Sequence, residues 1–410
     1  MPEWVRLLGD QALRWYWLGR VLSLVAASVV LVATPIAVYQ QTGSALWVSA
    51  LVAVHGLPYL VLGPVAGAVA DRNDRTVVLR SCELVTALAV GTLPVAAAFG
   101  GLTPVHVVVA VAVARTAFVF ADAANFGLVP AMAPPGRLAA VTALLFATSS
   151  VVEMVGPGIV GALSAFLPAP STIAVGACAS VLAFLCFQRG RLPRGAAAAS
   201  EVPAGMYRAI LDGARWLVSH RRVRSTILLG VAVTASQGVF VSQVVPWTVR
   251  RLDVPAGGGT TGMLFAAWAV GGLVATVVVP VATRRRTERS VAFAGLWVAA
   301  AGAIGCGFAT VVPVALALTV LWGSGYLSVV LATVVWRQLA TPDRLRSRVN
   351  TAARMAAYGV GYPLGGLLGG WATTLSGPHV AIGGAGIVIA AVAALGLRGL
   401  RGSGRGRGRG

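Results

Sequence analysis

Long apolar runs recur along the whole chain, separated by short polar gaps. A helix that crosses a lipid bilayer needs roughly 20 consecutive apolar residues, and these runs are too continuously apolar for the alternating strands of a membrane barrel. The pattern therefore predicts an all-α membrane protein with twelve transmembrane helices, at residues 15–39, 46–70, 77–99, 104–125, 138–166, 171–188, 223–249, 260–283, 290–309, 312–336, 350–374 and 378–398.

A polar break divides these runs into two sets of six. Within the break, apolar and charged residues alternate over 206–218 in the manner of an amphipathic helix on a membrane surface. We predict an N-terminal six-helix bundle over 1–188, a cytosolic linker over 189–222, a C-terminal six-helix bundle over 223–400 and a disordered Arg/Gly tail over 401–410.

Composition agrees with a membrane protein and explains the charge. The chain is 57% hydrophobic and 11% charged, far from the balance of soluble domains. Its formal net charge of +20 would indicate a nucleic-acid partner in a soluble protein. Here every basic residue is Arg, and nearly all lie between the apolar runs. We therefore expect a lipid bilayer around the chain and no nucleic-acid partner.

Arginine is confined to alternate gaps, which predicts the orientation. The gaps around 41–44, 100–103 and 168–171 contain no Arg, whereas Arg250 and Arg251 are the exception to the rule. Cytosolic loops carry the excess of Arg, so both termini are expected in the cytosol of a multi-pass protein of the cell membrane, working as a monomer. The Arg-rich gaps hold Arg72, Arg75, Arg80, Arg137, Arg284, Arg285, Arg286, Arg289, Arg337, Arg344, Arg346 and Arg348, together with the break at 189–224.

The second gap carries a charged motif after a helix end rich in small residues. Its members are Gly67, Asp71, Arg72, Asp74 and Arg75. The motif resembles the signature loop of the major facilitator superfamily, Gly-x-x-x-Asp-Arg-x-Gly-Arg, most closely in the drug-efflux branch with macrolide and enterobactin exporters, where an acid commonly replaces the second Gly. The resemblance implies the major facilitator fold and a conformational latch in this loop. The alternative is a plain positively charged turn.

The fifth run contains a second motif, Gly156, Pro157 and Gly161. It resembles part of the Gly-Pro-x-x-Gly-Gly element of antiporters, although Val160 stands in place of one Gly. Small residues allow neighbouring helices to approach closely, and Pro removes a backbone donor, which suits a gating helix. Ordinary packing in a chain with 50 glycines is the open alternative.

Ionisable side chains inside the runs are the candidates for proton coupling, because charges in the bilayer are costly unless paired or hydrated. They are Glu153, Arg115, Glu83 and Asp122, with Arg20 near a cytosolic end. Arg115 resembles an Arg that the family associates with proton transfer. Our hypothesis is that Glu153 exchanges protons, with a fixed Glu153–Arg115 pair as the alternative. Structural pairing is the alternative for the other three.

Polar and aromatic residues of the second half are candidates for a solute cavity: Gln237, Gln243, Trp268 and Tyr326. The alternative for the aromatic residues is an anchoring role at the membrane interface.

The function predicted is secondary active transport by alternating access. The chain has no Lys and hence no ATP-binding P-loop, its four cysteines lack metal-ligand spacing, and Gly323-Ser324-Gly325 only weakly resembles the Ser motif of an intramembrane protease. We therefore predict no enzyme, cofactor or metal. The favoured function is proton-coupled efflux of a hydrophobic or amphiphilic small molecule such as a drug, antibiotic or siderophore. A nutrient importer of the same fold is the alternative.

Overall fold

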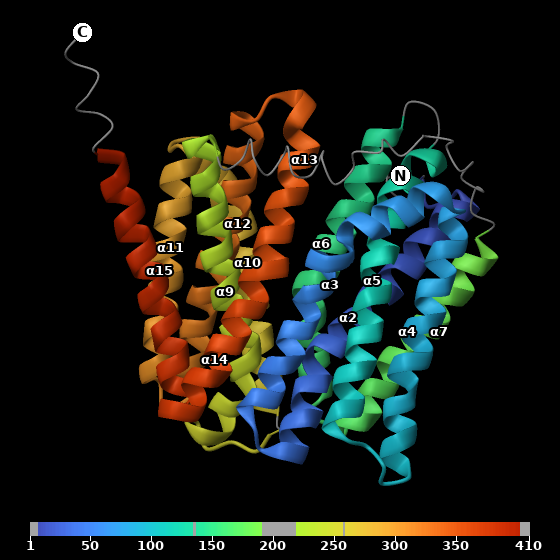
Figure 1. Cartoon of the computed structure of the whole chain (residues 1–410), viewed down its shortest axis with the longest axis horizontal. Coiled ribbons are helices and arrows are strands. Elements are labelled where there is room, and N and C mark those ends of the chain that lie inside the picture. The colour runs from blue at the N-terminus through green and yellow to red at the C-terminus, as the bar shows by residue number, and fades with distance from the viewer. Residues whose placement is uncertain (1–6, 134–136, 191–218, 257–258, 402–410) are drawn as a thin grey trace. The chain divides into compact units, whose positions relative to one another are not determined.

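The computed structural model describes residues 7–133, 137–190, 219–256 and 259–401 (Figure 1). Every regular element in these ranges is helical. The predicted linker helix at 206–218 and the tail at 402–410 lie outside them. Backbone packing divides the chain into two compact units.

The first unit contains the six helices predicted for the N-terminal half. α2 packs against α6 and α7, and α4 packs against α5 and α7 (Figure 1). Residues 44–56, the first half of α3, pack with the second unit instead. The helices are α2 (Gln11–Thr42), α3 (Ala45–Arg72), α4 (Arg75–Ala98), α5 (Pro104–Met132), α6 (Leu138–Leu163) and α7 (Ala169–Arg189).

The second unit holds the helices of the C-terminal half. α11 packs against α12 and α15, and α9 packs against α12, α14 and α15. The elements are α9 (Arg221–Arg250), α10 (Gly259–Thr283), whose first residues pack with the first unit, α11 (Glu288–Phe308), α12 (Val312–Ala340), α13 (Asp343–Arg354), η1 (Met355–Gly361), α14 (Tyr362–Ser376) and α15 (Pro378–Arg401).

The eleventh predicted span is not one α-helix. It consists of α13, the seven-residue π-helix η1 and α14. The carbonyl of Ala357 in η1 accepts a hydrogen bond of 2.9 Å from Thr234 Oγ1 of α9. A Cβ on Gly361 would lie 2.6 Å from the same hydroxyl. The wide turn of η1 is thus stabilised by the hydrogen bond from Thr234 and by the close approach of α9, which only Gly at position 361 permits.

Local sequence signals set the helix ends. Asp10 Oδ1 accepts from Leu13 N at 3.0 Å at the start of α2, and Thr103 Oγ1 accepts from His106 N at 3.2 Å at the start of α5. At the end of α2, Gly43 adopts the left-handed conformation with φ of 59°. These residues satisfy backbone groups that helix ends leave without partners.

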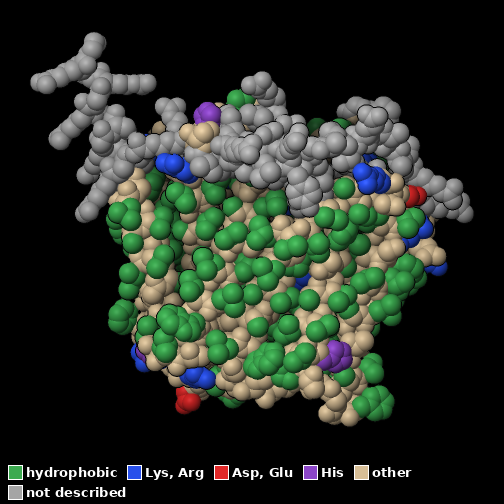
Figure 2. Space-filling view, viewed as in Figure 1, with side chains coloured by type: hydrophobic (Ala, Val, Ile, Leu, Met, Phe, Trp, Pro, Cys, Tyr) green, Lys and Arg blue, Asp and Glu red, His purple; other side chains and the backbone are tan. Residues whose placement is uncertain are grey.

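The flanks of the helices are apolar, as expected for a protein in lipid. Figure 2 shows hydrophobic side chains over most of the visible flank, with most of the visible charged side chains towards the helix ends. Leu88, Phe146 and Val277 are 63%, 74% and 69% exposed in mid-helix positions. Among the described residues, eleven helices are long and apolar enough to cross a membrane, and α13–η1–α14 supplies the remaining span. The predicted all-α membrane fold is confirmed.

Candidate functional site

The charged loop between α3 and α4 ends with the N-cap of α4. Asp74 Oδ1 accepts from Thr76 N at 2.9 Å and so forms the N-cap of α4. Asn73 Nδ2 donates to Val69 O at 2.9 Å, and Arg72 is exposed. The acid that departs from the broad family motif therefore has a structural role in starting the third span.

Gly67, Arg75 and Asp71 complete the loop motif. A Cβ on Gly67 would meet no heavy atom of the described residues within 4 Å. Arg75 opens α4 and is half-buried. Asp71 lies at the end of α3, and its side chain is not among those that the structure describes.

The five ionisable residues of the first unit, Arg20, Glu83, Arg115, Asp122 and Glu153, are called the charge cluster below. Arg20 Nη2 lies 3.3 Å from Asp122 Oδ1, and the two side chains are 11% and 14% exposed. Tyr59 Oη donates to Asp122 Oδ2 at 3.4 Å. Glu153 is exposed on α6 and attracts Arg20 electrostatically. Arg20 therefore pairs with Asp122 and attracts both Glu153 and Glu83.

Glu83 is the most buried acid of the charge cluster. Its side chain is 4% exposed, and Ser23 Oγ donates to Glu83 Oε1 at 2.5 Å. Arg80, one turn earlier on α4, donates to Phe187 O at 3.3 and 3.2 Å. Arg80 therefore satisfies the C-terminal end of α7 rather than neutralising Glu83.

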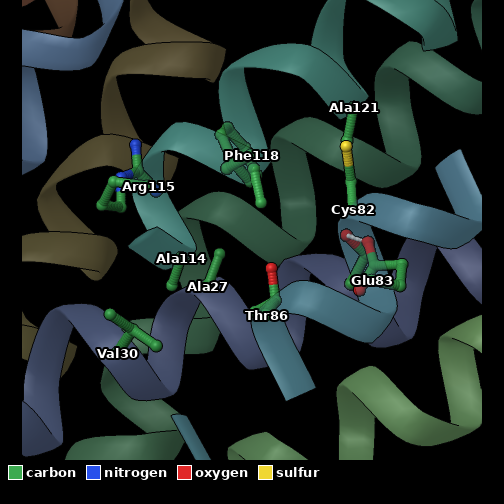
Figure 3. A pocket seen from close by; sticks show the side chains of 11 residues that line it. Ala27, Val30, Cys82, Glu83, Thr86, Ala114, Arg115, Phe118 and Ala121 are labelled. Atoms are coloured by element: carbon green, nitrogen blue, oxygen red, sulfur yellow. Dashed lines mark hydrogen bonds between the residues drawn. The ribbon is translucent and has the colours of Figure 1, made fainter. Parts of the chain in front are cut away.

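A small cavity borders Glu83 between α2, α4 and α5. Its volume is about 20 Å³, enough for about one water molecule. Figure 3 shows Glu83 and Arg115 on opposite sides of the view, with Thr86 and Phe118 between them. The lining is completed by Ser23, Ala27, Val30, Cys82, Ala114, Ala117 and Ala121. The cavity thus brings one acid and one guanidinium to the same space without joining them in an ion pair.

Arg115 packs on an aromatic ring. Its guanidinium carbon lies 4.5 Å from the centroid of the Phe118 ring, a favourable cation–π distance. Its Nε is buried and has no hydrogen-bond partner among the described residues. Arg115 thus lies on the Phe118 ring, whereas Glu153 attracts Arg20.

The apolar spans of the first unit hold equal numbers of acids and bases. They contain three carboxyl groups and three guanidinium groups, because Arg80 lies in the same span as Glu83. Arg80 donates to Phe187 O and Arg20 pairs with Asp122, whereas Glu83 accepts a hydrogen bond from the neutral hydroxyl of Ser23. An ionised carboxyl group beside a neutral donor is costly in the low dielectric of a bilayer.

The glycines of the predicted gating helix lie at tight contacts. A Cβ on Gly156 would lie 2.5 Å from Ser28 Oγ of α2. A Cβ on Gly161 would overlap the backbone of Gly262, which packs in the same unit. Pro157 is buried between them inside α6. The motif therefore permits backbone approaches that any larger residue would prevent.

Five rings of the second unit, Phe240, Phe265, Trp268, Trp322 and Tyr326, form what is called the aromatic cluster below. Phe240 and Trp268 stack with centroids 4.3 Å apart and planes 19° apart. Phe240 also meets Phe265 at 5.6 Å and Trp322 at 5.5 Å, both edge-to-face. Trp268 meets Trp322 at 5.4 Å and Tyr326 at 5.3 Å. The cluster joins α9, α10 and α12.

Hydrogen bonds extend the aromatic cluster towards η1. Tyr326 Oη donates to Gln237 Oε1 at 2.8 Å, and Tyr358 Oη lies 3.5 Å from Tyr326 Oη. Trp322 Nε1 donates to Ser236 Oγ at 3.3 Å. Of the predicted solute residues, Gln237, Trp268 and Tyr326 thus come together.

Gln243 is located elsewhere, in a fully buried polar contact. Thr373 Oγ1 donates to Gln243 Oε1 at 2.5 Å. Gln243 Nε2 donates to Ser242 Oγ at 2.9 Å and to Ser49 Oγ at 3.4 Å. The amide links α9, α14 and the first half of α3, and it faces no open space in this conformation.

Sequence reasoning missed the neutral members of both sites. Ser23 binds Glu83, and Tyr16 Oη donates to Asn125 Oδ1 at 2.7 Å beside the Arg20–Asp122 pair. Asn125 could have been identified from the sequence, since it is an amide inside an apolar run three residues after Asp122.

The described residues hold no group of three His, Cys, Asp or Glu side chains that could bind a metal ion. All four cysteines are free thiols.

Comparison with known proteins identifies the family. The model of the Major Facilitator Superfamily matches residues 16–352. The multidrug efflux pump Tap of Mycolicibacterium fortuitum is 27% identical over 358 residues, covering 86% of each chain. Macrolide efflux protein A of Streptococcus pyogenes is 23% identical over 214 residues, covering 52% of this chain and 53% of its own. These relatives support the drug-efflux branch.

Solved structures agree on the fold. The nucleoside transporter NupG superposes with a TM-score of 0.73 at 12% identity, covering 94% of this chain and 97% of its own. A bacterial homologue of the lysosomal transporter Spinster, captured facing inward and unoccupied, superposes with a TM-score of 0.67 at 17% identity, covering 94% and 92%. At these identities the likeness concerns the fold alone. The family match over most of the sequence and the helical architecture show that this chain is a multi-pass membrane transporter, not an enzyme, and that it belongs to the major facilitator superfamily.

Proposed function

We propose that this transporter exports a hydrophobic or amphiphilic small molecule from the cytosol in exchange for protons. Export is supported by the relatives, which are named as multidrug and macrolide efflux proteins. A cytosolic location of both termini is supported by the distribution of Arg between alternate gaps. The transporter acts as a monomer, with the α3–α4 loop as its latch and α6 as its gating helix.

Proton coupling rests on one observation, the burial of the Glu83 carboxyl against a neutral hydrogen-bond donor. Asp122 is paired with Arg20, and Glu153 is exposed and attracted by the same cation. Glu83 is buried, and its hydrogen-bond donor is the neutral hydroxyl of Ser23. We therefore assign the exchangeable proton to Glu83 rather than to Glu153.

The cavity beside Glu83 supplies a route for that proton. While the cavity holds no more than about one water molecule, a neutral carboxyl is the favoured form, because burial disfavours an isolated charge. When water enters, the ionised form becomes stable and the proton leaves. Arg115, which lines the same cavity on the Phe118 ring, then stabilises the carboxylate that remains.

Transport driven by a proton gradient tests the proposal. Inside-out membrane vesicles are given an acidic interior, and the membrane potential is clamped with valinomycin and potassium. Ethidium is followed by fluorescence, and radiolabelled erythromycin is included because one relative is named a macrolide efflux protein.

We expect uphill accumulation that a protonophore abolishes. Accumulation of neither probe, by a protein shown to be folded, would contradict export of these classes. Accumulation that persists with the protonophore would contradict proton coupling. If an alkaline interior drives accumulation instead, the protein is an importer of the same fold.

A further inference from the structure

The aromatic cluster lies at mid-depth in its helices, which distinguishes it from interface anchors. Tyr326 is at the middle of α12 (Val312–Ala340), and Trp268 and Phe240 are far from the ends of α10 and α9. Aromatic residues that anchor a helix at the membrane interface lie at its ends. The anchoring role considered from sequence is therefore wrong for these rings.

The cluster has a buried floor and an accessible rim. Trp322 and Phe240 are 0% and 1% exposed, whereas Trp268 and Gln237 are half-buried. Tyr358, which is joined to the cluster through Tyr326, is 36% exposed. The half-buried indole of Trp268 and the exposed phenol ring of Tyr358 therefore leave aromatic surface against which a further ring can pack.

Backbone features fix the rim in place. A Cβ on Gly323 of α12 would lie 2.5 Å from Trp268 O, so only Gly allows α10 and α12 to approach so closely beneath this indole. Tyr358 stands in the π-helix, where the Thr234 hydroxyl bonds to Ala357 O. Such wide turns often occur at functional sites because they change the direction of a side chain.

The hydrogen bonds at the rim leave a donor for a ligand. Tyr326 donates to Gln237 Oε1, which orients the amide. Gln237 Nε2 has no hydrogen-bond partner among the described residues. The site therefore offers two N–H groups next to aromatic surface, and these would bind an acceptor such as a carbonyl oxygen or a ring nitrogen.

Charge at this site does not favour a cation. The six apolar spans of the second half contain no Asp or Glu. We propose that Trp268, Tyr358 and Gln237 form a binding site for a flat, conjugated ring system that is uncharged and carries a hydrogen-bond acceptor. This inference rests on the proposed transport function and names the chemical class of one kind of solute.

Three uncharged probes of similar size separate the features of the site. Flavone is flat and has a carbonyl, flavanone has the carbonyl but is not flat, and 2-phenylnaphthalene has flat rings without the carbonyl. Binding is measured by equilibrium dialysis against the full-length protein in lipid nanodiscs, with empty nanodiscs subtracted. We expect flavone to bind about three- to tenfold more tightly than either of the others, the range for one aromatic contact or one hydrogen bond.

Variants assign the binding to these residues. Trp268→Leu should remove the preference for flat probes, and Trp268→Phe should restore part of it. Gln237→Leu should weaken flavone to the level of 2-phenylnaphthalene without changing 2-phenylnaphthalene itself. Trp297→Leu, at a 45% exposed position on α11 outside the cluster, is the control and should change nothing.

Equal affinity for flavone and flavanone in the unchanged protein would overturn the inference. So would an unchanged preference in Trp268→Leu. If Trp268→Leu does not fold, Gln237→Leu and Trp268→Phe decide the matter. Because no proton gradient is present, binding persists in Glu83→Gln, and a failure of proton coupling is thereby distinguished from a failure of this site.

Discussion

Replacing Glu83 with Gln isolates the proton from the rest of the transport cycle. The amide has the size of the protonated carboxyl and can keep a hydrogen bond with Ser23, now as donor. It cannot release a proton.

The size of the effect follows from one proton per cycle. A difference of one pH unit across the vesicle stores about 1.36 kcal/mol per proton, which corresponds to about tenfold accumulation of a solute. With the membrane potential clamped, the native protein should accumulate ethidium up to about tenfold per pH unit. Glu83→Gln should reach only about onefold, although it should still exchange labelled for unlabelled solute across the membrane.

The matched control is Glu153→Gln, which removes the exposed acid near Arg20. We expect it to retain gradient-driven accumulation. Should it lose accumulation while Glu83→Gln retains it, the proton travels through Glu153 and the assignment to Glu83 is wrong. If Glu83→Gln loses exchange as well as accumulation, the acid is structural and the coupling argument fails.

Three further predictions concern the gating helix, the latch and the topology. Gly161→Leu should destabilise the protein by about 1–3 kcal/mol through overpacking on Gly262. Gly230→Leu is the control and should not destabilise it, because a Cβ there meets no atom of the described residues within 4 Å. Equal melting temperatures of the two variants in detergent would contradict this prediction. Asp71→Asn should leave the abundance and melting temperature of the protein unchanged but lower export at least several-fold, because the latch uses this charge to favour one transport conformation over the other. Unchanged export at equal abundance would mean that the loop only sets the topology. In a background without the native cysteines, Asn73→Cys should be labelled only from the cytosol and Gly43→Cys only from outside, and the reverse pattern would overturn the orientation.

The fold could be predicted because the bilayer constrains it so strongly. Apolar runs of the required length correspond to helices in every described span, since backbone groups in lipid must be satisfied within a helix. The π-helix at Met355–Gly361 could not be found this way. Widening one turn leaves the composition of the run unchanged, and it is stabilised by Thr234 on another helix.

The members of the charge cluster could be predicted, but their partners could not. Ionisable residues stand out in an apolar run, and all five were identified from that signal. A fixed pair between Arg115 and Glu153 was one alternative, yet the position of a residue along a helix does not say which way its side chain points. The guanidinium group of Arg115 packs on the Phe118 ring, and Glu153 attracts Arg20 electrostatically.

Neutral partners gave even less signal. Ser23 and Tyr358 are ordinary residues of apolar helices, and only the three-dimensional packing shows that they meet Glu83 and Tyr326. Gln237 and Gln243 look alike in sequence, being two amides on α9. The structure separates them, since Gln237 lies at an accessible rim and Gln243 is fully buried with its amide bonded.

Release of protons on solute binding tests the central claim most directly. If the solute and the proton compete, each must lower the affinity of the protein for the other. Purified protein is placed in weakly buffered detergent solution near neutral pH, saturating ethidium is added, and the change in pH is recorded. We predict release of up to about one proton per bound ethidium by the native protein and by Glu153→Gln, and none by Glu83→Gln. Binding of ethidium to the native protein with no release anywhere between about pH 6 and pH 8 would contradict proton-coupled export.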